Sequence, residues 1–392
     1  MTKGKNKSVL IFAFITMLLI AVVDNIKGVL VPAFKTSFSI NNSQVGDIFF
    51  IGSIAYVLFT YLGGILCEKL GQKKTYGLGF IIIIFSSLLF YISKTYLMFL
   101  ICIFILNIGI ALVAISVNTL VPMISIGFQA LAMNLTHFCY GAGSTITQLT
   151  TGIVLSKGVS WRNIYLFISV LFLLAFIMFI FIKIPKNNIQ DNIDNVKNYK
   201  IKDALKEKLF YYYSFALGFY VFAEVATANW LVNFLQESYK FDYKMSSIYL
   251  SVFFILLTLG RLFGGFIVEK VGHLKSVIIA LFIALILYTI SLIIGGKFIF
   301  LICISGLFFS IVFPTVVSTI GINFRENSIY MSGIIITTSS IINMILNKFM
   351  GNLSDLIGTH KAFYMVPISL IIAIIFSIIT YKNTRKNRKT LV

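Results

Sequence analysis

The chain has 392 residues, of which 59% are hydrophobic and only 11% are charged. A soluble domain usually carries about 25% charged residues. This number of charged residues is too small to cover the surface of a soluble protein of this length. The composition therefore excludes a soluble protein and indicates that lipid is the main solvent. The net charge of +19 does not by itself indicate a nucleic-acid partner, because most of the basic residues lie in the polar segments outside the apolar runs.

Four cysteines lie singly inside apolar runs, without a CxxC or Cys/His spacing. This pattern predicts ordinary packing residues and neither a metal site nor a disulfide framework. The sequence also contains no HExxH, GxSxG, acidic metal cluster or phosphate-binding loop. We therefore expect that the protein is not an enzyme and that it has no cofactor.

A transmembrane helix needs about 20 mostly apolar residues. The first such run follows Lys3, Lys5 and Lys7 but has no small-residue cleavage site and carries Asp24, so we interpret it as a retained helix and not a signal peptide. The fold class predicted is an all-α, polytopic membrane protein. Its twelve expected spans lie near 9–33, 45–67, 76–93, 96–120, 131–156, 161–183, 209–236, 245–268, 275–295, 298–320, 329–350 and 362–381.

The one long polar run within the chain is Lys183–Lys208, which holds seven lysines and four acidic residues. We expect six-helix bundles at 1–184 and 209–392, joined by a cytoplasmic linker at 185–208. Outside the spans, more than twice as many lysines and arginines lie on the side of the termini and linker as on the other side. This bias predicts that both termini are cytoplasmic and that the protein lies in the inner membrane, with anionic lipids as partners and no nucleic acid.

A short motif occurs twice, with an offset of 201 residues between equivalent positions. Its glycines permit close helix approach and a tight turn, and its acid can accept from a neighbouring helix N-terminus. One copy is explained equally well as a helix-end turn with topology-setting lysines, but two copies at one offset favour a gating motif. A weaker third copy holds Gly351, Asp355 and Gly358. The two full copies are Gly64, Glu68, Lys69, Gly71 and Gly265, Glu269, Lys270, Gly272.

Charged residues inside the spans are functional candidates, because a charge at bilayer depth costs about 2.5–3.5 kcal/mol. Asp24 and Lys27 are spaced i, i+3 and can pair, either as a structural ion pair or as a proton and gating element. Glu224 lies on a polar helix face with Tyr220. We interpret Glu224 as facing a cavity, in preference to a buried structural hydrogen bond. Arg261 lies near a helix end, and we assign it to the gate network and not to the substrate site.

The span near 131–156 carries the clearest polar stripe, with steps of three and four residues. A lone membrane histidine is usually a packing residue, but an amide at each end of the same face favours a cavity-lining role for His137. Asn118 and Asn343 on other spans add hydrogen-bonding groups, with interhelical bonding an equally good explanation for Asn118. The stripe consists of Asn134, His137, Gly141, Ser144 and Gln148.

The repeated motif resembles the loop motif of the major facilitator superfamily, with Glu in place of the usual Asp and Lys69 and Lys270 where Arg is common. Residues 218–225 with 230–235, residues 306–318, and residues 134–143 with Trp161 and Arg162 look like fucose permease-like sugar transporters. The resemblance implies two six-helix bundles around a midplane cavity, alternating access, and transport of a sugar or similar polar solute.

The proton site of fucose-transporting members cannot be copied onto this chain. Aligned on Asn118, the place of their carboxylate is Ala114, and aligned on Pro32, the place of their aspartate is Gly28. If protons are coupled, Asp24 or Glu224 must carry them. Efflux of drugs or other metabolites and a non-transporting membrane sensor remain the alternatives. We expect a monomer.

Overall fold

The computed structural model describes residues 3–184, 201–324 and 328–389. Every regular element that it describes is helical, which confirms the all-α class. The predicted linker 185–208 falls largely on residues 185–200, which lie outside the described residues. The helices of the N-terminal part are α1 (Lys3–Phe38), α2 (Asn42–Lys69), α3 (Gln72–Ile92), α4 (Tyr96–Ile124), α5 (Gln129–Ser156) and α6 (Trp161–Phe181).

After the gap at 185–200, a single short helix precedes the remaining long helices. The tenth expected span is made of a 3-10 turn and two helices in succession. The elements are α7 (Ile201–Ala204), α8 (Lys208–Tyr239), α9 (Tyr243–Val271), α10 (His273–Ile294), η2 (Gly296–Phe300), α11 (Leu301–Phe309), α12 (Val312–Phe324), α13 (Ser328–Ile357), α14 (Thr359–Ala362) and α15 (Met365–Lys389).

Capping residues account for several helix starts. The side chain of Asn41 accepts from Gln44 N, and Asn41 N donates to Gln44 Oε1, which forms a capping box at α2. Thr95, Ser160 and Asp242 cap α4, α6 and α9 in the same way with one side-chain oxygen each. These polar residues stand between apolar runs, so the sequence itself sets the positions at which the chain turns back.

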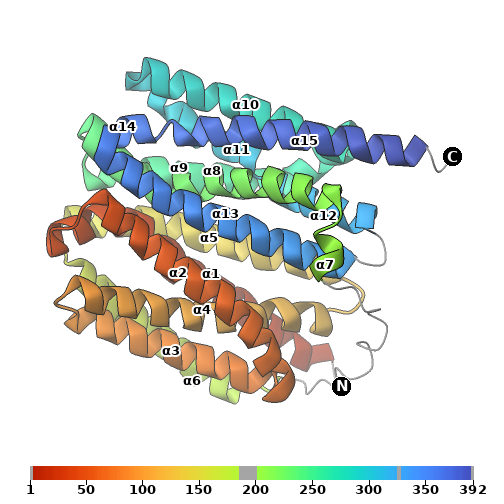
Figure 1. Cartoon of the computed structure of the whole chain (residues 1–392). Helices are drawn as coiled ribbons and strands as arrows, with labels where there is room; N and C mark the ends of the chain where they lie inside the picture. The colour runs from red at the N-terminus through yellow and green to blue at the C-terminus, as the bar shows by residue number, and fades with distance from the viewer. Residues whose placement is uncertain (1–2, 185–200, 325–327, 390–392) are drawn as a thin grey trace.

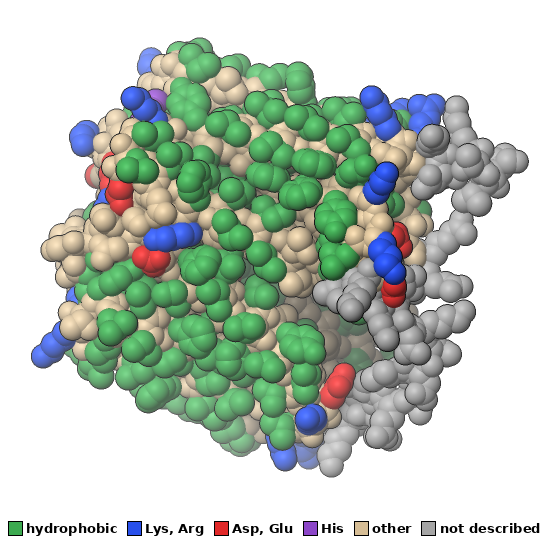
Figure 2. Space-filling model, in the orientation of Figure 1, with side chains coloured by type: hydrophobic (Ala, Val, Ile, Leu, Met, Phe, Trp, Pro, Cys, Tyr) green, Lys and Arg blue, Asp and Glu red, His purple; other side chains and the backbone are tan. Residues whose placement is uncertain are grey.

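Eleven segments of the described chain are long and apolar enough to cross a membrane. Helix α5 is not one of these segments, although it is 28 residues long and packs between α1 and α9. The polar stripe with Asn134, His137 and Gln148 explains this difference, because it removes apolar residues from one whole helix face. Figure 2 shows hydrophobic side chains over the middle of one face of the molecule, with charged side chains gathered towards its two ends.

The two groups of helices lie side by side, with α3, α4 and α6 on one side and α10, α11 and α15 on the other (Figure 1). Both chain ends and α7 lie at one end of the molecule, here called the termini end. We call the opposite end, where α1 ends and α2 begins, the distal end. Helices α1, α2 and α5 of the first group pack against α8, α13 and α9 of the second.

Glycines lie at close approaches between the two groups. A Cβ atom on Gly28 of α1 would lie 2.2 Å from the carbonyl oxygen of Ala228 in α8. On Gly351 of α13 it would lie 2.4 Å from the carbonyl oxygen of Asn42, at the distal end. Backbone atoms cannot move aside as a flexible side chain can, so only glycine allows these helices to pack this closely.

The groups do not meet in this way at the termini end. A Cβ atom on Gly64 or Gly265 would have no atom within 4 Å among the described residues. Neither glycine therefore lies at a close helix approach in this conformation, and the role that we expected of them remains a prediction. The turn role expected of Gly71 and Gly272 is confirmed by their φ angles of 86° and 94°.

Two alanine substitutions in α13 test the importance of the distal contact. Alanine at an exposed helix position raises helix propensity, so Gly333→Ala, which meets open space, should raise stability by up to about 1 kcal/mol. Gly351→Ala gains the same propensity but must push α2 away, with an expected net loss of about 2 kcal/mol. Thermal unfolding in detergent measures both changes, and equal shifts for the two variants would contradict the tight contact.

Candidate functional site

Two carboxylates occupy corresponding places in the first long helix of each group. Asp24 of α1 and Glu224 of α8 are 200 residues apart, close to the offset of 201 in the repeated motif. Asp24 lies four residues before Gly28, and Glu224 lies four residues before Ala228, at the point where the two helices touch. Both carboxylates therefore lie about one helical turn from this contact, on its termini side.

Asp24 is held by a cation on its own helix and by a phenol on α5. Lys27 Nζ lies 2.8 Å from Asp24 Oδ1, and the Tyr140 hydroxyl donates to Asp24 Oδ2 over 2.8 Å. The side chain of Asp24 is 30% exposed and that of Lys27 is 12% exposed. A carboxylate in this position requires such partners, because an unpaired charge away from water is costly.

An amide network ties the Asp24 cluster to α5. Asn25 Nδ2 donates to the Tyr140 hydroxyl oxygen over 2.9 Å and to Ser144 Oγ over 3.0 Å, and Gln148 Nε2 donates to the backbone oxygen of Asn25 over 2.9 Å. Sequence reasoning missed Asn25 and Tyr140. Tyr140 stands three residues after His137 and four before Ser144, so the same stripe could have revealed it.

Glu224 forms the corresponding cluster in the second group. Arg261 of α9 reaches Glu224 Oε1 with a 3.3 Å contact, and the Tyr220 hydroxyl donates to Glu224 Oε2. The Tyr220 oxygen also lies 2.7 Å from the backbone oxygen of Phe309, and the Tyr220 side chain is fully buried. Arg261, which we assigned to the gate network, thus pairs with Glu224, and its gating role remains a prediction.

Helix α5 brings the two clusters to the same level. Tyr140 contacts Asp24, while a Cβ on the next residue, Gly141, would lie 2.3 Å from the side chain of Thr258 in α9. Thr258 is three residues before Arg261, which pairs with Glu224. The charged clusters of the two groups therefore lie on either side of one helix, near the middle of the spans.

The remaining polar residues of the α5 stripe divide into two sets. Gln148 is buried against α1, whereas Asn134 and His137 are exposed on the half of α5 that lies towards the termini end. His137 is within electrostatic range of Arg261. Neither side chain is covered by other described residues, and their role in lining a cavity remains a prediction.

Asn118 and Asn343 have different surroundings. Asn118 Oδ1 on α4 is buried and has no hydrogen-bond partner among the described residues. Asn343 Oδ1 on α13 accepts from Asn347 Nδ2 over 2.7 Å, and Asn347 in turn accepts from Trp230 Nε1. Asn343 thus already has a structural partner, while Asn118 keeps an acceptor for another group.

The distal end is closed by side chains from both groups. Asp355, in the weak third copy of the motif, accepts from Asn42 N over 2.9 Å and from Ser43 N over 2.6 Å at the start of α2. Lys348 pairs with Asp47 over 2.8 Å. These contacts, together with a Lys35–Glu237 ion pair, connect α1 and α2 to α8 and α13. The acid of the third copy thus makes the helix N-terminus contact that the motif predicts.

The two full motif copies make no such contact in this conformation. Glu68, Lys69, Glu269 and Lys270 are all exposed and form no hydrogen bond or ion pair with described residues. They lie at the termini end, where Gly64 and Gly265 have no close neighbour among the described residues. Their gating role remains a prediction. In the described part of the chain, no cluster of His, Cys, Asp and Glu could hold a metal ion.

Exchange of Glu224 and Arg261 for neutral residues tests the cluster in α8 and α9. Glu224→Gln leaves the guanidinium without its anion, and Arg261→Gln leaves the carboxylate without its cation, so each should lower stability by about 2 kcal/mol. The double variant removes both charges and should lose less than the sum of the single changes. Thermal unfolding of all four proteins measures this coupling, and additive losses would show that the two groups do not interact.

Comparison with known proteins places the chain in a family. The Major Facilitator Superfamily matches residues 12–332. A putative glucose/galactose transporter of Helicobacter pylori is 26% identical over 78% of this chain and 79% of that protein. The L-fucose-proton symporter of Escherichia coli is 24% identical over 95% of this chain and 93% of that protein.

An inward-facing, unoccupied bacterial homologue of the human lysosomal transporter Spinster has a TM-score of 0.83 and 14% identity, and the match covers 98% of this chain and 99% of that chain. The transporter FucP in its outward conformation has a TM-score of 0.65, with 22% identity and coverage of 95% and 98%. The chain belongs to the Major Facilitator Superfamily of membrane transporters.

Proposed function

We propose that the protein carries a neutral sugar across the membrane by alternating access. The observation that carries this proposal is the pairing of each deep carboxylate with a cation, Asp24 with Lys27 and Glu224 with Arg261. The site therefore has balanced charge, and a charged solute would have to compete with these pairs. A neutral solute needs no counter-charge, and hexoses are named as the cargo of the glucose/galactose transporters that the chain resembles.

The free hydrogen-bonding groups suit a polyhydroxyl compound. The unpaired oxygen of Asn118 can accept from a hydroxyl, and Asn134 and His137 offer exposed donors and acceptors. A site built to bind hydroxyl groups discriminates strongly against solutes that lack them, because its polar groups would then stay unpaired. We assign these three residues to sugar binding, and Gln148 and Asn343 to support of the site.

The conformation fits the inward-facing state of such a cycle. The Asp355, Lys348 and Lys35 contacts close the distal end, while Gly64 and Gly265 of the motif copies have no close neighbour at the termini end. The higher TM-score with the inward-facing structure than with the outward one supports this assignment. We place the termini in the cytoplasm and propose that bundles 1–184 and 209–392 rock about the site, with Glu68 and Glu269 making contacts in the outward state.

Protons are the coupling ion that the site chemistry favours. Protonation of Glu224 would remove the negative charge that holds Arg261, and the guanidinium would then favour a different partner or greater contact with water. Such a change links proton binding to the arrangement of α8 and α9. We propose that Glu224 carries the proton, in a monomer surrounded by anionic lipid in the bacterial inner membrane.

Uptake of labelled glucose and galactose into proteoliposomes tests this function. An inward proton gradient should increase the accumulated sugar at least tenfold over the level without a gradient. Glu224→Gln should abolish this increase but keep sugar exchange, because the neutral side chain imitates the protonated state. Asp203→Asn, in the short helix α7 at the termini end, is the control and should behave like the natural protein, because Asp203 lies outside the Glu224 cluster.

Two outcomes would contradict the proposal. Gradient-driven uptake that survives Glu224→Gln would show that another group carries the proton. Movement of a cationic dye without any movement of hexose would indicate efflux of a different class of cargo.

A further inference from the structure

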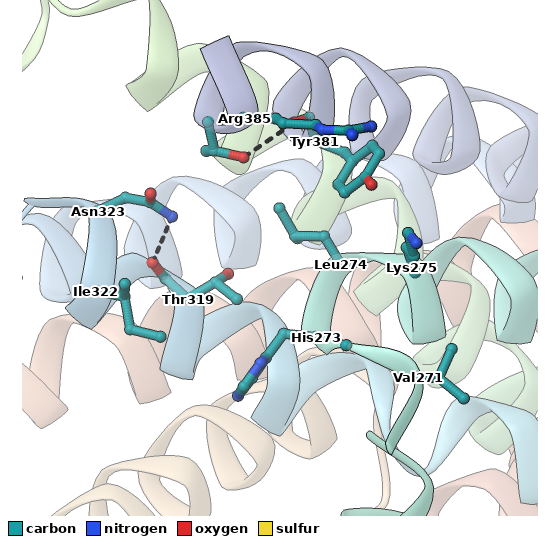
Figure 3. A pocket seen from close by; sticks show the side chains of 11 residues that line it. Val271, His273, Leu274, Lys275, Thr319, Ile322, Asn323, Tyr381 and Arg385 are labelled. Carbon is teal, nitrogen blue, oxygen red and sulfur yellow. Dashed lines mark hydrogen bonds between the residues drawn. The ribbon is translucent and has the colours of Figure 1, made fainter. Parts of the chain in front are cut away.

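A cavity of about 340 Å³ lies at the termini end of the second helix group, between α10, α12 and α15 (Figure 3). It contains no residue of the Asp24 and Glu224 clusters, although Gly272 of the repeated motif lies on its wall. Side chains of α10, α12 and α15 contribute to its wall, among them Leu274, Ile322 and Tyr381.

The charged groups on this cavity are basic. Lys275 and Arg385 line it, both are exposed, and neither forms an ion pair with a described residue. None of the described lining residues is acidic. In Figure 3, the side chains of Lys275, Tyr381 and Arg385 lie close together on one side of the cavity. Two unneutralised cations beside a hydroxyl form a suitable environment for a phosphate group.

The start of α10 adds a second favourable feature. Gly272 precedes the helix with a φ angle of 94°, and no side chain caps the first backbone N–H groups. The unpaired N–H groups at a helix start attract an anion, and Gly272 and His273 both line the cavity. The cavity is thus positive from its side chains and from its backbone.

An apolar groove of about 370 Å³ adjoins the basic cavity. It runs between α9, α10 and α11, and Val271 lines both spaces. Its walls include Phe263, Ile267, Ile279 and Ile283. The first three of these side chains are exposed, so the groove opens on the surface that contacts lipid chains. A basic cavity beside an apolar groove matches a molecule with a phosphate head and a hydrocarbon tail better than a free phosphate.

We propose that this corner of the protein binds one anionic phospholipid, with its phosphate between Lys275 and Arg385 and an acyl chain in the groove. The lipid would come from the leaflet at the termini end. The site lies wholly within the second helix group, so its occupancy does not depend on the transport function proposed above.

Thermal unfolding of the purified protein, with phosphatidylglycerol added to detergent micelles, tests the proposal. A ligand that binds only the folded state stabilises it by RT ln(1 + L/Kd), where L is the free ligand concentration, so the unfolding temperature rises with the free lipid concentration. We expect dioleoyl phosphatidylglycerol to raise it and phosphatidylcholine to leave it unchanged. The double variant Lys275→Gln with Arg385→Gln should need at least tenfold more phosphatidylglycerol for the same shift.

The matched control is Lys74→Gln with Lys382→Gln, which removes two exposed charges at the same end without touching the cavity. This variant should respond like the natural protein, and the unfolding temperatures without lipid show that every variant folds. An equal loss of response in both double variants would overturn the site in favour of general charge attraction. If inorganic phosphate, or phosphatidylglycerol with six-carbon chains, acts as strongly as the dioleoyl lipid, the acyl-chain part is wrong and the cavity is a free phosphate site.

Discussion

A charge cannot remain unpaired among helices that lie in lipid, and the arrangement of this protein follows from that constraint. Asp24 requires Lys27 and the Tyr140 hydroxyl, which fixes α5 against α1. Glu224 requires Arg261 and the Tyr220 hydroxyl, which fixes α9 against α8. Each carboxylate thus links two helices, and the two ion pairs leave a central region without net charge. A neutral solute can enter such a region without breaking either ion pair.

Close backbone approach is the second constraint, and it distinguishes the two ends of the molecule. Gly28 and Gly351 let helices of the two groups touch, while Gly64 and Gly265 meet open space. The third motif copy is instructive because it makes its contacts in this state: Gly351 permits the approach, and Asp355 accepts from the start of α2. The two full copies have a similar set of residues. In a state in which the termini end closes, Glu68 and Glu269 could accept from a helix start in the same way.

Much of the fold could be predicted from the sequence because lipid imposes a simple pattern of length and polarity. The Asp24–Lys27 pair could also be predicted, since both residues lie on one turn of one helix. The Glu224–Arg261 pair could not be predicted, because the two residues are 37 positions apart and meet only through the packing of α8 on α9. The same applies to Asn25 and Tyr140, which meet only through the packing of α1 on α5. Local spacing determines contacts within a helix, whereas contacts between helices depend on crossing geometry.

Distances between spin labels at the two ends provide the most direct test of alternating access. One pair would replace Lys157 and Lys361 at the distal end, and another would replace Lys74 and Lys275 at the termini end, in a chain without its four native cysteines. Without sugar, we predict a short distal distance and a long termini distance. With sugar and acid pH, a second population should show the opposite combination. Two distances that lengthen together, or that never change, would contradict transport by alternating access.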